Sequence, residues 1–103
     1  MIESQVEKYF RQRAVQTGAL TWKLVSTGSA GVPDRILVQE GHTYFVELKR
    51  PMERPRDIQR VRARQLRARG AKVFCISSKE QVDRFMIEAI TKEGPDPDDY
   101  DPI

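Results

Sequence analysis

The fold of this chain is decided by the stretch Gly31-Val32-Pro33-Asp34-Arg35-Ile36-Leu37-Val38-Gln39-Glu40-Gly41-His42-Thr43-Tyr44-Phe45-Val46-Glu47-Leu48-Lys49. Two runs of apolar and β-branched residues flank Glu40-Gly41, which is typical of a β-hairpin with a two-residue turn. If Glu40 and Gly41 are the loop residues, Gln39 pairs with His42. Counting five places back along each strand then pairs Asp34 with Glu47. The hairpin register therefore predicts two carboxylates directly opposite each other on one face of a sheet.

A pair of opposed carboxylates indicates a metal site, because like charges directly opposite destabilise a strand pair. Divalent cations such as Mg²⁺ or Mn²⁺ prefer oxygen ligands of this kind. Lys49 lies two residues beyond Glu47 and points to the same face. An ammonium group there could hold a water molecule or stabilise a developing negative charge. The alternative is that Asp34 is a turn residue and that Glu47 and Lys49 form a surface ion pair.

The order and spacing of these residues resemble a known nuclease signature. Pro33-Asp34, thirteen residues later followed by Glu47-Leu48-Lys49, resembles the PD-(D/E)XK motif. The segments 31–35 and 45–49, together with Gln59, resemble more specifically the VRR-NUC branch, the virus-type replication–repair nucleases. The resemblance extends from about residue 3 to residue 90. It implies an α/β fold with an αβββαβα core and a mixed central sheet.

The resemblance also implies roles for individual residues. Asp34, Glu47 and the main-chain carbonyl of Leu48 would bind Mg²⁺ or Mn²⁺. Lys49 would orient the attacking water or stabilise charge on the phosphate, and Gln59 matches a family position near the active site. A helical wheel turns Glu3 closer than Glu7 to the apolar stripe of the first helix. Glu3 is therefore expected at the site and Glu7 is the reserve, although both could simply be acids favoured by the helix dipole.

Composition is consistent with a nucleic-acid partner. The 103 residues carry a net charge of +3, with 39% hydrophobic and 32% charged residues. The last ten residues contain four aspartates and no basic residue, so the remainder of the chain carries +7. A small basic domain points to a polyanion, whereas a merely solubilising surface charge is the alternative. The single cysteine, Cys75, lies in an apolar run and is expected to be a buried thiol rather than a nucleophile.

Basic residues concentrate in the segment that follows the hairpin. Five arginines lie along a predicted helix from Asp57, expected to be its N-cap, to about Arg69. Guanidinium groups suit phosphate contacts, and the residues expected to bind nucleic acid are Arg56, Arg60, Arg64 and Arg67. A solvated basic face is the alternative. The loop 26–31 could let a nucleic-acid backbone approach closely, or it could be a flexible connection.

The remaining elements complete the predicted domain. We expect helices at about 3–17 and 79–90, where apolar residues recur at helical spacing. We expect strands at 20–25, from composition, and at 72–76, from a continuous apolar run. Residues 1–93 would form a single nuclease domain, and residues 94–103 an acidic, disordered tail. No signal peptide and no membrane-spanning run are present, so we expect a cytoplasmic protein, phage-encoded or in a bacterial host.

These observations together predict a metal-dependent deoxyribonuclease. By family resemblance it would cut branched DNA such as Holliday junctions or flaps during replication, repair or recombination. Members that stand alone resemble junction resolvases that act as homodimers, and a two-fold axis matches the symmetry of a four-way junction. The alternatives are a nucleic-acid-binding module without catalysis, which the arginine helix alone would satisfy, and a restriction-type nuclease.

Overall fold

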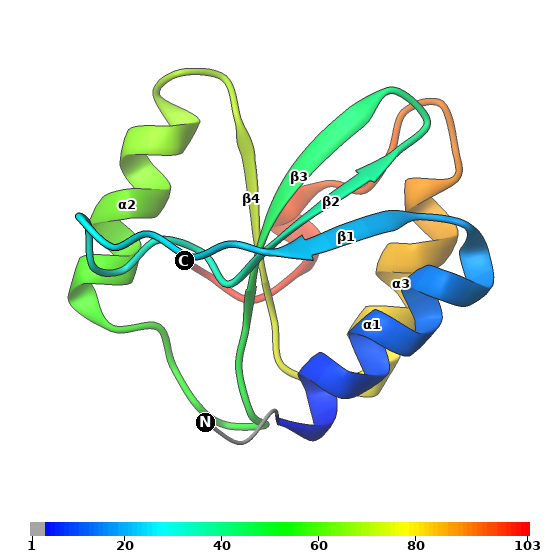
Figure 1. The fold of residues 1–103 in the computed structure, drawn as a ribbon, viewed down its shortest axis with the longest axis horizontal. Coiled ribbons are helices and arrows are strands. Elements are labelled where there is room, and N and C mark those ends of the chain that lie inside the picture. The colour runs from blue at the N-terminus through cyan, green and yellow to red at the C-terminus, as the bar shows by residue number, and fades with distance from the viewer. Residues whose placement is uncertain (1–3) are drawn as a thin grey trace.

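A computed structural model describes residues 4–103 and shows a mixed sheet between two layers of helix (Figure 1). The elements follow the chain as α1 (Gln5–Thr17), β1 (Leu20–Lys23), β2 (Arg35–Gln39), β3 (His42–Leu48), α2 (Asp57–Arg67), β4 (Lys72–Ile76), α3 (Lys79–Ala89) and a short 3₁₀ turn at Pro97–Asp99. The strand order is β1-β2-β3-β4, with β3 and β4 parallel and the other pairs antiparallel. The predicted mixed α/β fold is confirmed.

The hairpin register is the one that the sequence predicts. Gln39 pairs with His42 and Arg35 with Val46. Glu40 and Gly41 have φ values of 51° and 78°, as a type I′ turn requires at both central positions. Because this register continues by one residue at the open end of the hairpin, Asp34 and Glu47 lie opposite each other.

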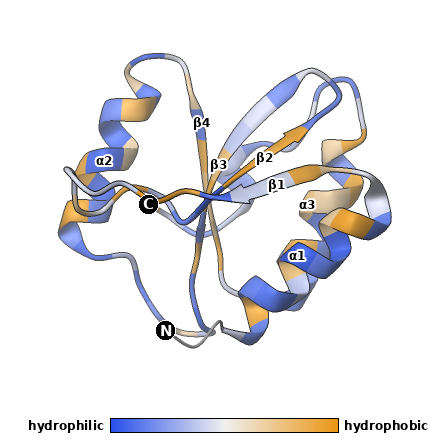
Figure 2. Ribbon diagram, in the orientation of Figure 1, coloured by the Kyte–Doolittle hydropathy of each residue, from blue (hydrophilic) through white to orange (hydrophobic). Residues whose placement is uncertain are grey.

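The alternation of side chains along the strands separates the hydrophobic core from the polar face. Leu37, Tyr44, Val46 and Phe74 are buried on the face that α1 and α3 cover. Asp34 and Glu47 fall on the other face, which is covered by α2 and the loop that precedes it (Figure 1). In Figure 2 much of α2 is hydrophilic, whereas β2 is largely hydrophobic. The α2 face is therefore the one on which polar chemistry can be built.

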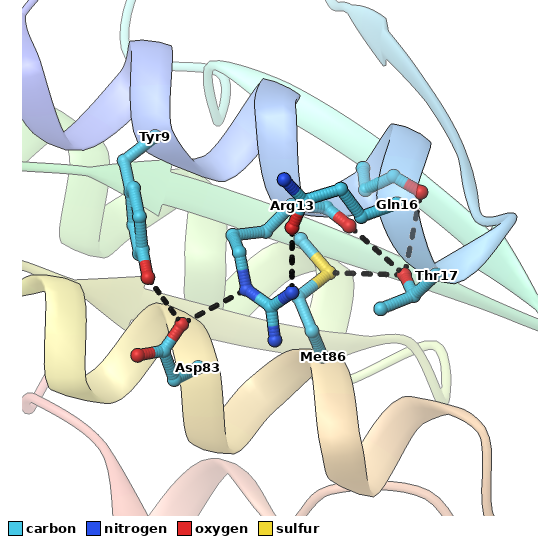
Figure 3. A network of polar contacts seen from close by, with 7 residues as sticks. Tyr9, Arg13, Gln16, Thr17, Asp83 and Met86 are labelled. Atoms are coloured by element: carbon cyan, nitrogen blue, oxygen red, sulfur yellow. Dashed lines mark hydrogen bonds and ion pairs between the residues drawn. The ribbon is translucent and has the colours of Figure 1, made fainter.

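Arg13 fits poorly in the apolar stripe of α1, and the structure shows how it is accommodated. Its Nε donates to Asp83 Oδ1 on α3 at 3.0 Å, and its Nη1 donates to Gln16 Oε1 at 2.7 Å. Tyr9 donates its hydroxyl to the same Asp83 oxygen at 2.6 Å. Figure 3 shows this network between the two helices. The polar contacts fix α1 against α3 and leave the apolar residues of the stripe free to fill the core.

The boundaries of two elements differ from the predictions. The N-cap of α2 is Arg56 rather than Asp57, because the Gln59 side chain accepts a hydrogen bond from the Arg56 main-chain N–H at 2.7 Å. The strand β1 ends at Lys23, where it stops pairing with β2. Glu3, predicted to lie in the first helix, is outside the described residues, and Ser4 caps α1.

The prediction that residues 94–103 form a disordered tail is wrong. The Tyr100 ring is 7% exposed and packs edge-on against Phe74 and Phe85. Its hydroxyl donates to Glu88 Oε1 at 2.6 Å. Asp101 makes a β-bridge to Cys75, which covers part of the free edge of β4. One aromatic ring and one bridge thus order a segment whose proline- and aspartate-rich composition favoured disorder.

Candidate active site

Asp34 is held at the open end of the hairpin by contacts on both sides. Its main-chain carbonyl accepts a hydrogen bond from Leu24 N at 2.7 Å, and its Oδ2 accepts one from Leu48 N at 2.9 Å. The preceding Pro33 is fully buried. The carboxylate is therefore fixed across the end of β3, directly beside Glu47.

Glu47 is a carboxylate in an almost completely buried position, with 1% of the residue exposed. Its Oε2 accepts a hydrogen bond from Gln59 Nε2 at 2.7 Å and lies 3.4 Å from Lys49 Nζ. Its Oε1 is buried and has no hydrogen-bond partner among the described residues. A buried acceptor without a partner costs about 1–3 kcal/mol, or more when charged, so this oxygen is available to a bound group.

The surroundings of Glu47 disfavour its charged form. Burial, followed by repulsion from Asp34, raises the pKa of Glu47 from an ordinary value of 4.5 to about 7, although the nearby Lys49 ammonium opposes the rise. Such a pKa means that the two carboxylates resist carrying two negative charges together near neutral pH. A cation between them would remove that resistance.

Lys49 and Gln59 both contact Oε2 of Glu47. Lys49 is 8% exposed, and its main-chain N–H donates to Ile76 O at 2.9 Å, which extends β3 beside β4. Gln59 uses both ends of its amide, since Oε1 caps α2 through Arg56 and Nε2 binds Glu47. The start of α2 is thus coupled to one oxygen of Glu47, and its other oxygen remains available.

The available donors fit a hard divalent cation. Asp34 and Glu47 supply carboxylate oxygens. The resemblance also implies the main-chain carbonyl of Leu48 as a ligand, and Leu48 lies between Glu47 and Lys49 in the chain. Oxygen ligands without histidine or thiolate are those that Mg²⁺ and Mn²⁺ accept. Within residues 4–103 no group of three or more His, Cys, Asp or Glu side chains converges on one point. Further positions around a cation would therefore fall to main-chain oxygens, water, substrate or Glu3, which is outside the described residues.

Glu7, the reserve carboxylate, is not brought to this pair. Its Oε2 lies 3.3 Å from Arg35 Nη1, and the two side chains are 14% and 7% exposed. Arg35 also donates from Nε to Thr21 Oγ1 at 3.1 Å. Since Arg35 follows Asp34 directly, its side chain points to the opposite face of the sheet. Glu7 therefore fixes α1 over β2 and does not face Asp34 and Glu47.

The arginines of α2 fall into two groups on opposite sides of the helix. At about 100° per residue, Arg56, Arg60, Arg64 and Arg67 lie on one side, and Arg62 lies roughly opposite them. Arg64 and Arg67 are exposed, and within residues 4–103 their guanidinium groups have no hydrogen bond or ion pair. Arg60 instead pairs with Asp57 at 3.1 Å.

Sequence reasoning did not single out Arg62. Arg62 Nε donates to Ala30 O at 2.9 Å, so this side of α2 touches the loop before β2. The angular separation of Arg62 from Arg60 was readable from the sequence, but the loop that it meets was not.

The fold is that of the PD-(D/E)XK class of nucleases, with a hairpin that aligns Asp34 with Glu47-Leu48-Lys49 and a helix that adds Gln59. A search of family models finds no match. A curated phage protein, "Putative nuclease p44" of Acyrthosiphon pisum secondary endosymbiont phage 1, is 34% identical over 79 residues, which cover 76% of this chain and 85% of that protein. A solved structure described as a VRR_NUC domain superposes with a TM-score of 0.73 at 34% identity and covers 81% of this chain and 91% of its own.

This chain therefore belongs to the VRR-NUC family of nuclease domains. A nuclease domain acts on nucleic acid, and the basic α2 borders the candidate site. Of the helices in residues 4–103, none has the length and apolar character needed to cross a membrane.

Proposed function

We propose that this protein is a metal-dependent endonuclease that hydrolyses DNA phosphodiester bonds at Asp34 and Glu47. The observation that carries the proposal is the buried, unpartnered Oε1 of Glu47 beside a second carboxylate, with Lys49 3.4 Å from the other oxygen. A protein without a use for that oxygen would gain stability from an uncharged side chain there.

Each residue of the site has its own role in hydrolysis. Asp34, Glu47 and the Leu48 carbonyl would hold Mg²⁺ or Mn²⁺, which when bound would supply an acidified water and a positive charge beside the phosphate. Gln59 holds Oε2 of Glu47, which would leave Oε1 for the ion. The Lys49 ammonium orients the attacking water or stabilises the negative charge that grows on the phosphate oxygens. Attack by water forms one P–O bond and breaks another, which leaves a phosphate end and a hydroxyl end.

Basic residues around the site bind the substrate. Arg56, Arg64 and Arg67 are exposed and can contact phosphates without breaking any ion pair of the described residues. Arg60 can join them because its pair with Asp57 is solvent-exposed and such pairs are weak. Glu3 is proposed as the additional carboxylate at the metal, either directly or through water.

The proposed substrate is branched DNA, such as a Holliday junction or a flap, and the proposed assembly is a homodimer. A catalytic domain with a radius of gyration of 12.6 Å offers little surface to hold two DNA arms. Two copies related by a two-fold axis would present two sites to a junction of the same symmetry. A role in replication, repair or recombination follows from that substrate.

The test is to incubate the purified protein with labelled linear, flap and four-way-junction DNA, with Mg²⁺, Mn²⁺ or EDTA. We expect cleavage only with a divalent cation, with branched DNA cut at lower enzyme concentration than linear DNA. Asp34→Asn, whose Oδ1 can still accept from Leu48 N, should fold but not cut. If Asp34→Asn cuts at the wild-type rate, the site is elsewhere. If no substrate is cut under any condition, the chain is a non-catalytic nucleic-acid binder.

A further inference from the structure

A groove runs between α2 and the loop that leads into β2. Its volume is about 450 Å³. The loop side contributes Ser26, Ser29 and Pro33, and the helix side contributes Arg62, Leu66 and Arg69. Figure 1 shows this loop crossing from β1 to lie against α2. The groove is distinct from the carboxylate pair but begins next to it, since Pro33 directly precedes Asp34.

Contacts within the protein hold the two walls at a fixed separation. Gly31 has a φ of +81°, and a Cβ atom at that position would lie 2.8 Å from the main-chain carbon and oxygen of Ile58 on α2. Only glycine permits this close approach. Arg62 adds a hydrogen bond from Nε to Ala30 O at 2.9 Å. The groove is therefore formed before any ligand binds.

The positive charges of the groove are oriented but not neutralised. Arg62 donates to Ala30 O and, at 3.0 Å, to Gln65 Oε1, and Arg69 donates to Gln65 O at 2.9 Å. All of these acceptors are uncharged. By contrast, Arg13, Arg35, Arg60 and Arg84 pair with carboxylates. Because the groove is lined by two such guanidinium groups and by no carboxylate, its electrostatic preference is for an anion.

The other residues that line the groove indicate which class of anion fits it. Val32, Pro33 and Leu66 give the groove an apolar surface, and the two serine hydroxyls add neutral donors. An apolar surface bordered by guanidinium and hydroxyl groups matches the alternation of sugar and phosphate in a nucleic-acid backbone. Arg62 lies three residues after Gln59, or roughly 4.5 Å along the helix, and Leu66 lies roughly 10 Å along it. At about 3.4 Å per phosphate along one strand, these positions lie roughly one to three phosphates from the carboxylate pair.

We propose that this groove is a subsite for the sugar–phosphate backbone of the cleaved strand, with Arg62 and Arg69 on its phosphates within about three nucleotides of the scissile bond. The inference rests on the proposed function, because it takes DNA as the substrate and the carboxylate pair as the place where a strand is cut. It assigns the strand that is cut to the Arg62 side of α2, whereas Arg64 and Arg67 on the other side would contact DNA away from the cut.

The experiment pairs charge removal in the protein with charge removal in the DNA. Single methylphosphonates, which are uncharged, are placed one at a time along the cleaved strand of a labelled junction, and binding is measured in Ca²⁺. Wild type should lose affinity several-fold at one or two positions on one side of the cut. Arg62→Gln/Arg69→Gln should bind unmodified DNA at least tenfold more weakly and should show no further loss at those positions.

Two further variants make the result specific. Arg64→Gln/Arg67→Gln removes the same charge from the opposite side of α2 and should keep the wild-type loss at the groove positions. Arg69→Gln alone leaves the Arg62–Ala30 contact in place, so it tests the groove even if the double variant loosens the loop. If Arg62→Gln/Arg69→Gln and Arg69→Gln both remain as sensitive as wild type at every methylphosphonate position, the strand does not lie in this groove.

The result of this binding experiment can be distinguished from the result of the cleavage assay that tests the proposed function. Wild-type cleavage in Mg²⁺, abolished in Asp34→Asn, would uphold the nuclease assignment even where the groove variants show no coupling. Coupling at the groove without cleavage by wild type would keep the groove as a site for a DNA strand and would reject the proposed catalysis at Asp34 and Glu47. Coupling that appears in Arg64→Gln/Arg67→Gln instead would move the cleaved strand to the other side of the helix and overturn the inference.

Discussion

Replacement of Glu47 by glutamine should stabilise the metal-free protein at alkaline pH. The buried carboxyl has a pKa of about 7 in the folded protein, against an ordinary value of 4.5. At about 1.4 kcal/mol for each pH unit of difference, ionising Glu47 in the folded state costs roughly 3 kcal/mol. Glutamine keeps an oxygen that can accept from Gln59 and Lys49, and its amide can donate to Asp34. The charge is removed while the hydrogen bonds remain.

The pH range of the effect follows from the direction of the shift. Between about pH 4.5 and pH 7 the folded protein keeps a proton on Glu47 that the unfolded chain has lost. The contribution of this group to the free energy of unfolding therefore falls as pH rises through that range and is level above it. Glu47→Gln should match wild type near pH 4 and exceed it by up to roughly 3 kcal/mol at pH 8.

Urea unfolding in EDTA at a series of pH values measures this difference directly. Glu93→Gln is the matched control, because Glu93 is exposed and its replacement should change stability by less than about 0.5 kcal/mol. Adding Mn²⁺ should stabilise wild type more than Glu47→Gln, since the cation compensates the carboxylates. A Glu47→Gln variant that is less stable than wild type at pH 8 in EDTA would refute the reasoning.

Three further predictions follow from other parts of the structure. Gly31→Ala should destabilise the protein more than Gly41→Ala in thermal unfolding. Both glycines have a positive φ, which costs alanine about 1 kcal/mol, but only a Cβ at position 31 would meet Ile58. Tyr100→Ala should cost about 3–5 kcal/mol by urea unfolding, as for other buried aromatic residues, whereas a cost near zero would return residues 94–103 to a disordered tail. Glu3→Gln should slow cleavage more than Glu7→Gln, which should chiefly lower stability by leaving the buried Arg35 without a carboxylate partner. The opposite ranking of cleavage rates would place Glu7 at the metal.

Local rules were enough to predict the hairpin that carries the candidate site. A two-residue turn at Glu40-Gly41 fixes the register of a hairpin, and the register alone aligns Asp34 with Glu47. Their chemistry, two opposed carboxylates with a lysine on the same face, needs no knowledge of the other elements. The mixed order of strands and helices likewise followed from the helical spacing of apolar residues and from the composition of the strands.

Features that depend on packing between distant segments could not be predicted in this way. A helical wheel treats α1 alone and cannot show that Arg35 on β2 holds Glu7. Composition favours disorder for residues 94–103, but a gap beside Phe74 and Phe85 accepts the Tyr100 ring. The division of the arginines between two sides of α2 has meaning only once Gly31 has placed the loop against one of those sides.

Binding of Mn²⁺ in the absence of DNA tests most directly whether Asp34 and Glu47 form a metal site. The ion is titrated into wild type, Asp34→Asn, Glu47→Gln and the Glu93→Gln control at pH 8, and free Mn²⁺ is followed by electron paramagnetic resonance. We expect saturable binding to wild type and Glu93→Gln, and at least tenfold weaker binding to both site variants. Near pH 7 wild-type binding should also release a fraction of a proton, because Glu47 must ionise. Equal Mn²⁺ affinity in all four proteins would contradict the assignment of the metal to this pair.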